Sequence, residues 1–151
     1  MKSEMLNLGN ARIGFKNFAG VEGPYNKRGD RNFAVFLDND QAQELEAQGW
    51  NIKWPKPNAD INPEEDTRQP HLPVSISFDY YPPKVVFISN GNLTVVNEDE
   101  IDSLDYAEYS NIDLVLRPYN WSVNGKSGIK AYVKAMYVTL ETDAFSSKYG
   151  I

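Results

Sequence analysis

The sequence contains no cysteine and a single histidine, His71, which lies between Pro70 and Pro73. Without thiols the chain cannot form disulfides or thiolate-ligated metal sites. This inventory also argues against zinc chemistry, a cysteine nucleophile and a His-based catalytic triad. We therefore expect no catalytic residue, no metal ligand and no cofactor.

Long hydrophobic runs are missing as well. No segment approaches the ~18 apolar residues that a membrane span requires. The first residues, M-K-S-E-M, contain no apolar signal segment. We therefore expect no membrane contact and a cytoplasmic protein.

The sequence also lacks the glycine motifs of nucleotide-binding and hydrolytic enzymes. It contains no G-x-G-x-x-G after a strand, no G-x-x-x-x-G-K-[ST] and no G-x-S-x-G. The densest acidic cluster, Asp99, Glu100 and Asp102, raises a metal-dependent nuclease as an alternative. However, a run of charge on a short helix is usually a solvated face, and spaced partners that would hold magnesium are missing. We therefore expect a protein without enzymatic activity.

Positive charge is in deficit: 15 Lys and Arg against 21 Asp and Glu give a net charge of −6. Because a basic footprint is the usual signature of nucleic-acid binding, this balance argues against such a partner. The charges are segregated, however. Acidic residues concentrate in segments 38–46, 60–66 and 98–108, whereas segments 12–31 and 117–134 are net positive. An acidic protein with this distribution can still present a cationic groove.

The length and the apolar pattern predict one mainly β domain, residues 1–151. Short strands at even spacing with turn signals favour an antiparallel β-barrel or sandwich, with antiparallel connections throughout. Among the first strand's apolar residues, Ile13, Phe15 and Phe18 are candidates for burial, and the strand at 32–37 should be central because both of its faces are apolar. Strands are expected at residues 10–18, 32–37, 50–54, 72–78, 85–88 and 93–96, and short helices at 41–48 and 98–104.

Two segments should lie outside this regular structure. Residues 55–73 are rich in proline and acidic side chains and poor in apolar ones, which predicts a mobile loop. Residues 142–151 are expected to form a short tail.

The most informative segment is 115–140, which predicts a long β-hairpin with a turn at N-G-K-S-G. It contains no acidic residue and interleaves cations with aromatics. Such a surface suits a single-stranded nucleic acid, whose phosphates need positive charge and whose bases need a face for stacking. Ordinary strand propensity and edge protection by lysine are the alternative explanation. The cations are Arg117, Lys126, Lys130 and Lys134, and the aromatics are Tyr119, Trp121, Tyr132 and Tyr137.

The alternation places these side chains in rows. On the second arm, the even-numbered residues 130–134 share one face, and the odd-numbered residues 129–133 share the other, which we expect to be core. On the first arm, the odd-numbered residues 117–121 share a face. Whether the two aromatic and basic rows meet depends on a one-residue choice of register, which the sequence leaves open.

Two further places offer candidate contacts. The glycine-rich segment 20–31 carries three cations and could clamp a phosphate backbone, although a solvated connection would have the same composition. Trp54 could stack on a base, or it could be half core. The predicted nucleic-acid-binding residues are Lys27, Arg28, Arg31, Trp54, Arg117, Tyr119, Trp121, Lys126, Lys130, Tyr132 and Lys134.

Five stretches together resemble the single-stranded DNA-binding proteins of tailed bacteriophages. They are F-K-N-F-A-G-V-E-G-P-Y-N-K-R-G-D-R-N-F-A-V-F-L-D (15–38), A-Q-G-W-N-I-K (47–53), S-F-D-Y-Y-P-P-K-V (77–85), L-D-Y-A-E (104–108) and R-P-Y-N-W-S-V-N-G-K-S-G-I-K-A-Y-V-K-A-M-Y-V-T-L (117–140). The resemblance covers nearly the whole chain in order.

This resemblance implies an oligonucleotide/oligosaccharide-binding (OB) fold, a small, partly open β-barrel with one or two short helices. It also implies a protein that coats and protects single-stranded DNA during phage replication or recombination, in the cytoplasm of the host. Replication or recombination proteins would then be further partners, and a homodimer is open. Many members end in a strongly acidic tail, whereas this sequence ends F-S-S-K-Y-G-I, so recruitment by such a tail is in doubt.

The main alternative is a non-enzymatic structural or adaptor β-domain of a phage. The hairpin would then be a protein interface, with its tyrosines and tryptophan as anchors.

Overall fold

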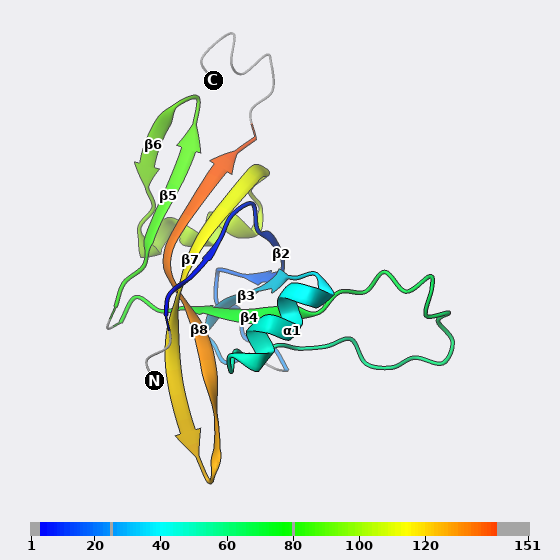
Figure 1. The fold of residues 1–151 in the computed structure, drawn as a ribbon. Coiled ribbons are helices and arrows are strands. Elements are labelled where there is room, and N and C mark those ends of the chain that lie inside the picture. Colours follow the sequence, from blue (N-terminus) through cyan, green and yellow to red (C-terminus); the bar gives the residue numbers. More distant parts are fainter. Residues whose placement is uncertain (1–3, 25, 80, 142–151) are drawn as a thin grey trace.

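The sheet is organised around strand β8 (Lys126–Leu140), which pairs with three other strands. The computed structural model describes residues 4–24, 26–79 and 81–141, and the eight strands in these residues form one mixed sheet (Figure 1). β8 is antiparallel to β7 (Tyr109–Val123) over its whole length. It is parallel to β4 (His71–Ile76) near its start and to β5 (Lys84–Ser89) near its end.

The prediction of antiparallel connections throughout is therefore wrong at two ladders. Both parallel ladders join β8 to strands that are separated from it by other elements of the chain, so each needs a long crossover. Turn signals in a sequence report only neighbouring strands, which is why these pairings were missed.

The other strands extend this centre on both sides. β1 (Leu6–Leu8) pairs with β7, and β4 is followed in the sheet by β3 (Arg31–Phe36) and β2 (Arg12–Asn17). The predicted central position of the strand at 32–37 is confirmed, because β3 lies between β2 and β4. Among the described residues no ladder joins β1 to β2, so the pairings do not close the sheet into a ring.

A second, shorter hairpin extends the sheet beside β8. β6 (Asn92–Val95) pairs with β5 through a turn at Asn90 and Gly91, both of which have positive φ. This is the two-residue turn that twisted hairpins prefer, and it joins the strands predicted at 85–88 and 93–96.

Each of the two helices has an aspartate at one end that accepts backbone hydrogen bonds. α1 (Asn39–Ala47) begins after Asp38, whose side chain accepts a hydrogen bond of 2.7 Å from the backbone N–H of Gln41. This confirms the helix predicted at 41–48, which begins at residue 39 behind an aspartate cap. The predicted second helix is a 3₁₀ helix, η1 (Glu98–Asp105), and its last residue accepts hydrogen bonds from the backbone N–H groups of Phe18 and Ala19, at 2.8 and 3.0 Å.

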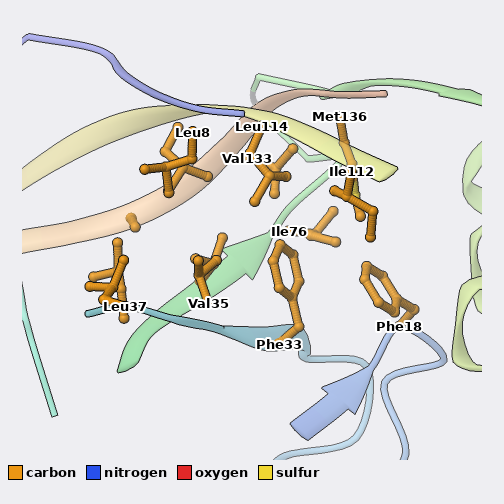
Figure 2. Close-up of a cluster of buried hydrophobic side chains, with 14 of the residues drawn as sticks. Leu8, Phe18, Phe33, Val35, Leu37, Ile76, Ile112, Leu114, Val133 and Met136 are labelled. Atoms are coloured by element: carbon orange, nitrogen blue, oxygen red, sulfur yellow. The ribbon is translucent and has the colours of Figure 1, made fainter. Parts of the chain in front are cut away.

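The core lies between the β7–β8 hairpin and β3, as Figure 2 shows. Leu114 and Met136 point inward from the hairpin, and Phe33 points toward them from β3. Phe18 stacks on Phe33 with 5.1 Å between ring centroids. The odd-numbered residues 129–133 are buried, which confirms that face of the second arm as core.

The prediction that Phe15 is buried is wrong. Phe18 is fully buried and Ile13 packs against the core, but Phe15 is 70% exposed. The register between β2 and β3 shifts between Gly14 and Asn17, and Phe15 has a φ of 47°. Because this bulge breaks the two-residue alternation, Phe15 turns to the opposite side of the sheet.

Residues 50–54 do not form the predicted strand. Trp50 and Ile52 are buried in the core, as their spacing suggests, but the segment that carries them forms only isolated bridges. One bridge joins Trp50 to Ile129, and another joins Lys53 to His71. The segment therefore fills the space between β4 and β8 where these two strands diverge.

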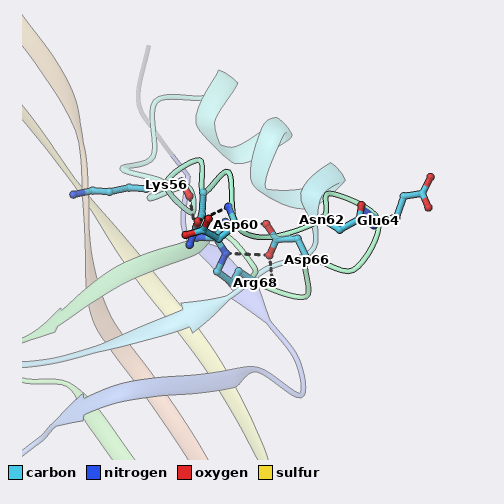
Figure 3. Close-up of polar contacts among 7 residues, drawn as sticks. Lys56, Asp60, Asn62, Glu64, Asp66 and Arg68 are labelled. Carbon is cyan, nitrogen blue, oxygen red and sulfur yellow. Dashed lines mark hydrogen bonds and ion pairs between the residues drawn. The ribbon is translucent and has the colours of Figure 1, made fainter.

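The predicted loop at 55–73 overlaps the start of β4 and otherwise contains no regular element (Figure 3). Within it, Arg68 pairs with Asp66 at 2.8 Å and donates to the carbonyl of Lys56 at 2.9 Å. The hydrogen bond from Arg68 lowers the pKa of Asp66 to about 2. The predicted tail at 142–151 lies outside the described residues.

Candidate nucleic-acid interface

The register of the long hairpin brings the two predicted rows onto one face. Arg117 lies opposite Tyr132, Tyr119 opposite Lys130, and Trp121 opposite Gly128. Directly opposed residues of an antiparallel pair share a face. Asn124 and Gly125 form the turn with φ values of 52° and 78°, and this two-residue turn fixes the register that the sequence left open.

We call the surface opposite the core the outer face. On the hairpin it carries Arg117, Tyr119, Trp121, Lys130 and Tyr132. Tyr119 is 51% exposed and Trp121 36% exposed. Ile129, which lies between their partners in β8, is buried in the core. The tip of the hairpin, beyond its pairing with β4, projects away from the other strands (Figure 1).

Tyr132 lies at the centre of this surface. The Arg117 guanidinium is 5.1 Å from its ring centroid and 4.8 Å from that of Tyr81, and the Lys130 ammonium is 5.0 Å from the Tyr132 ring. Tyr119 meets Tyr132 edge to face, with 6.1 Å between centroids. These contacts hold both cations beside flat rings rather than beside acids. Neither Arg117 nor Lys130 forms an ion pair with a described carboxylate.

Trp121 lies close to the backbone of the opposite strand. A Cβ added at Gly128 would be 3.0 Å from Cζ2 of the indole. The absence of a side chain at Gly128 therefore lets the ring lie low on the strand while keeping a third of its surface exposed.

Two further predicted lysines extend the surface. Lys126 lies opposite Val123 at the tip, in register with the outer row. Lys134 lies where the register between β7 and β8 shifts at Val115 and Leu116, and it is exposed. The hairpin thus carries exposed cations at its tip, in its middle and at its base.

The outer face continues across the sheet. Tyr132 lies opposite Ser75 of β4, and Ser75 lies opposite Asn32 of β3. The side-chain amide of Asn32 donates to Oδ1 of Asn26 at 2.7 Å.

Asn26 in turn holds the predicted basic loop in place. Its amide donates to the carbonyls of Val21, Lys27 and Asp30, at 2.9 to 3.1 Å. The loop that carries the exposed Lys27 and Arg28 is therefore anchored on the outer face, next to Asn32, which lies across the sheet from Tyr132.

Two predicted residues lie elsewhere. Arg31 shares the inner side with Ile76, donates to the Phe18 carbonyl and lies 3.9 Å from Glu98, and its side chain is only 19% exposed. Trp54 donates its indole N–H to Glu46 of α1 at 2.8 Å. The structure does not bring either residue to the outer face of the hairpin.

Sequence reasoning missed Tyr81, which adds a second ring to Arg117. Tyr81 was assigned to a turn in the stretch D-Y-Y-P-P-K, and no local pattern reports that this turn lies beside the hairpin.

In the described part of the chain, no group of three or more His, Asp or Glu residues is placed to hold a metal ion. Within the same residues, no helix has the length and apolar character to cross a membrane.

A family profile described as "Putative phage ssDNA-binding domain" matches residues 1–151 of the chain. No curated protein is significantly similar to the chain in sequence.

Three solved structures of one protein are similar in fold. The chain has a TM-score of 0.54 and 10% identity with the single-stranded DNA-binding protein from bacteriophage Enc34 in complex with ssDNA, over 93% of this chain and 89% of that one. A C-terminal truncation of the Enc34 protein has a TM-score of 0.52 and 11% identity with the chain, over 92% of this chain and 87% of that one. A third structure, the Enc34 single-stranded DNA-binding protein, has a TM-score of 0.52 and 12% identity, over 93% of this chain and 83% of that one. At these identities the similarity shows a shared fold.

Proposed function

This chain belongs to the phage single-stranded-DNA-binding domain family, and from that premise we propose how it holds DNA: a basic, aromatic surface on the outer face binds the strand without sequence preference. Phosphates would lie against Arg117 and Lys130 of the hairpin and against Lys27 and Arg28 of the 20–31 loop. Bases would stack on Tyr119, Trp121 and Tyr132. Each stacked base contributes about 1–3 kcal/mol, and every base has a flat face, so such binding is tolerant of sequence.

The hairpin register carries this proposal. It gathers aromatic and cationic side chains from both arms onto one exposed face, although the protein as a whole has a charge of −6. Long-range repulsion from the acidic segments is screened at physiological salt, where the Debye length is about 8 Å. Local cations on the outer face then dominate the contact with phosphate.

The proposal extends to the protein's role. We infer that it coats and protects single strands during phage DNA replication or recombination, in the host cytoplasm, and catalyses no reaction. The Enc34 protein, which shares the fold, has been solved in complex with ssDNA. This fold likeness also supports an OB-type architecture, a partly open barrel that presents a β-face and loops to a strand.

Tryptophan fluorescence tests the proposal. Trp50 is buried and Trp54 is bonded to Glu46, so Trp121 is the tryptophan on the proposed surface. Titration with oligo(dT) should quench the fluorescence saturably, and the binding should weaken at about 0.5 M salt, where screening is strong. Trp121→Phe should remove most of the signal.

Two variants locate the contact. Tyr132→Ala should weaken binding by about tenfold, the loss expected for one stacking platform. Tyr106→Ala should have no effect, because Tyr106 is 86% exposed but lies at the end of η1. Oligomers that form through the hairpin, with no response to oligo(dT), would instead favour the adaptor function.

A further inference from the structure

A second aromatic cluster lies on β2, β3 and β4. The ring of Phe15 is 5.6 Å from that of Phe36 and 5.5 Å from that of His71, and Phe36 and His71 are 6.2 Å apart. All three pairs are tilted or edge to face, so the rings form a compact group. This cluster was not predicted from the sequence, because the three residues are far apart in the chain.

This cluster lies on the outer face. Ser75 of β4 shares a face with Tyr132, and His71 precedes Ser75 by four residues in the same strand. Residues an even number apart in a strand share a face. Phe36 lies directly opposite His71, so it is on this face as well. From about 3.3 Å per residue and about 4.8 Å between strands, Tyr132 and His71 are on the order of 14 Å apart.

Cations flank the cluster on both sides. Arg12 of β2 lies opposite Phe36, and Lys53 lies opposite His71. Both are exposed, and neither forms an ion pair with a described carboxylate. The order across the sheet is therefore Arg12, Phe36, His71, Lys53, which repeats the mixture of cations and rings on the hairpin.

The histidine behaves as a third flat ring at neutral pH. Burial, and secondarily the charge of Lys53, lowers the pKa of His71 below its ordinary value. The imidazole is therefore neutral at pH 7, and Arg12 and Lys53 carry the positive charge.

Neither core packing nor backbone preference accounts for Phe15. Its ring is 70% exposed, whereas a phenylalanine in a strand normally contributes to the core. Its φ of 47° lies in a region that residues other than glycine rarely adopt. A large apolar ring that is held outward by an unfavourable backbone is a sign of a binding role.

Gly14 completes the arrangement. A Cβ at Gly14 would be 2.5 Å from Cε2 of Phe36, so the Phe36 ring lies over this glycine. Trp121 has the same relation to Gly128 on the hairpin. Each end of the outer face thus has an aromatic ring that lies close to a glycine backbone.

We propose that Phe15, Phe36 and His71 form a second base-stacking site, flanked by Arg12 and Lys53 as phosphate contacts. The site takes bases of the same DNA strand that the hairpin binds, so one strand crosses the outer face from the hairpin to β2. This inference rests on the proposed function, since it presumes that the hairpin face binds single-stranded DNA.

The variant Phe15→Gly tests the site without threatening the fold. Glycine adopts positive φ readily, so the substitution removes the ring and relieves the backbone at once. The melting temperature should therefore stay the same or rise. Affinity for an oligo(dT) of about 16 nucleotides, the upper end of the site sizes of OB folds, should fall about tenfold. Phe15→Trp should retain binding, and Tyr106→Ala is the matched control.

A cross-linking measurement reads the position directly. Oligonucleotides that contain 5-iodouracil cross-link on irradiation to aromatic rings that stack on the base. Cross-links should form at Phe15, Phe36 or His71 as well as on the hairpin, and Arg12→Glu should reduce those at the cluster.

The outcomes separate the two proposals. If Phe15→Gly binds like the wild type while Tyr132→Ala is weakened, the second site is wrong and the proposed function stands. If Phe15→Gly is weakened and Tyr132→Ala is not, the aromatic cluster binds DNA without the hairpin, so the proposed function of the hairpin and the continuous path across the outer face are both wrong. If the wild-type protein binds no single strand at all, the proposed function fails and the second site fails with it.

Discussion

Trp121 lies directly over Gly128 of the neighbouring strand, with 3.0 Å between the position of a Cβ on Gly128 and Cζ2 of the indole. The orientation of the ring is therefore set by a missing side chain on the opposite strand. A residue that makes no polar contact with a ligand can in this way control how an aromatic surface is presented.

Gly128→Val should displace the indole of Trp121. Gly128 has no positive φ, and valine favours strands, so the fold should persist. We expect a shifted emission maximum, a several-fold loss of affinity for oligo(dT) and little change in melting temperature. Ser127→Val is the control, because Ser127 is the next residue and faces the other side of the hairpin. An equal loss of affinity in both variants would show that the position of Trp121 is unimportant.

Lys130→Glu should weaken binding and reduce its salt dependence. Lys130 is exposed beside Tyr132 and has no described acidic partner. Each phosphate contact on a single strand adds about 0.7 to the slope of log K against log salt. The slope should therefore become shallower by about that amount, measured by titration at several salt concentrations. Lys56→Glu, in the loop before β4, should leave the slope unchanged, and an equal effect of both substitutions would place the binding surface elsewhere.

Arg31 and Arg28 should differ in what they affect. Arg31 donates to the Phe18 carbonyl and lies near Glu98 in a largely buried position, so Arg31→Ala should lower the free energy of unfolding by about 1–3 kcal/mol. Arg28 is exposed in the anchored loop, so Arg28→Ala should weaken DNA binding and leave stability unchanged. Urea unfolding and oligo(dT) titration of both variants check this. Equal stability of the two would contradict the structural role of Arg31.

Acidification should destabilise the fold through His71. Its pKa is lowered in the folded protein, so the unfolded chain binds the proton more tightly. The free energy of unfolding should therefore decrease as the pH falls below about 6.5, the ordinary pKa of histidine. Urea unfolding between pH 7.5 and 5.5 measures this, and His71→Asn should flatten the dependence. A wild-type stability that is constant over this range would show that His71 titrates as it does in the unfolded chain.

Features that depend on adjacent residues were predictable. The helix after β3, the place of the long hairpin's turn and the buried side of the 129–133 segment all follow from local rules, and all are confirmed, although the turn uses only Asn124 and Gly125 of the predicted N-G-K-S-G. The predicted outer row of the hairpin was correct within each arm. Only the pairing between the arms had to come from the structure.

Features that depend on distant residues were not predictable. The parallel ladders of β8 join segments more than 45 residues apart. The bulge that turns Phe15 outward has no local signal, and the inward direction of Arg31 depends on its pairing with Ile76. A charged residue in a basic loop looks like a ligand contact until its strand register is known, as the example of Arg31 shows.

The position of β8 also constrains how the protein is made. β8 is the last strand in the described chain, yet it joins β4, β5 and β7 into one sheet. During translation, the earlier strands therefore leave the ribosome without the neighbour that completes their hydrogen bonding. The sheet can be completed only after residue 140 has been synthesised, and until then β4 and β5 expose edges that other nascent chains can pair with.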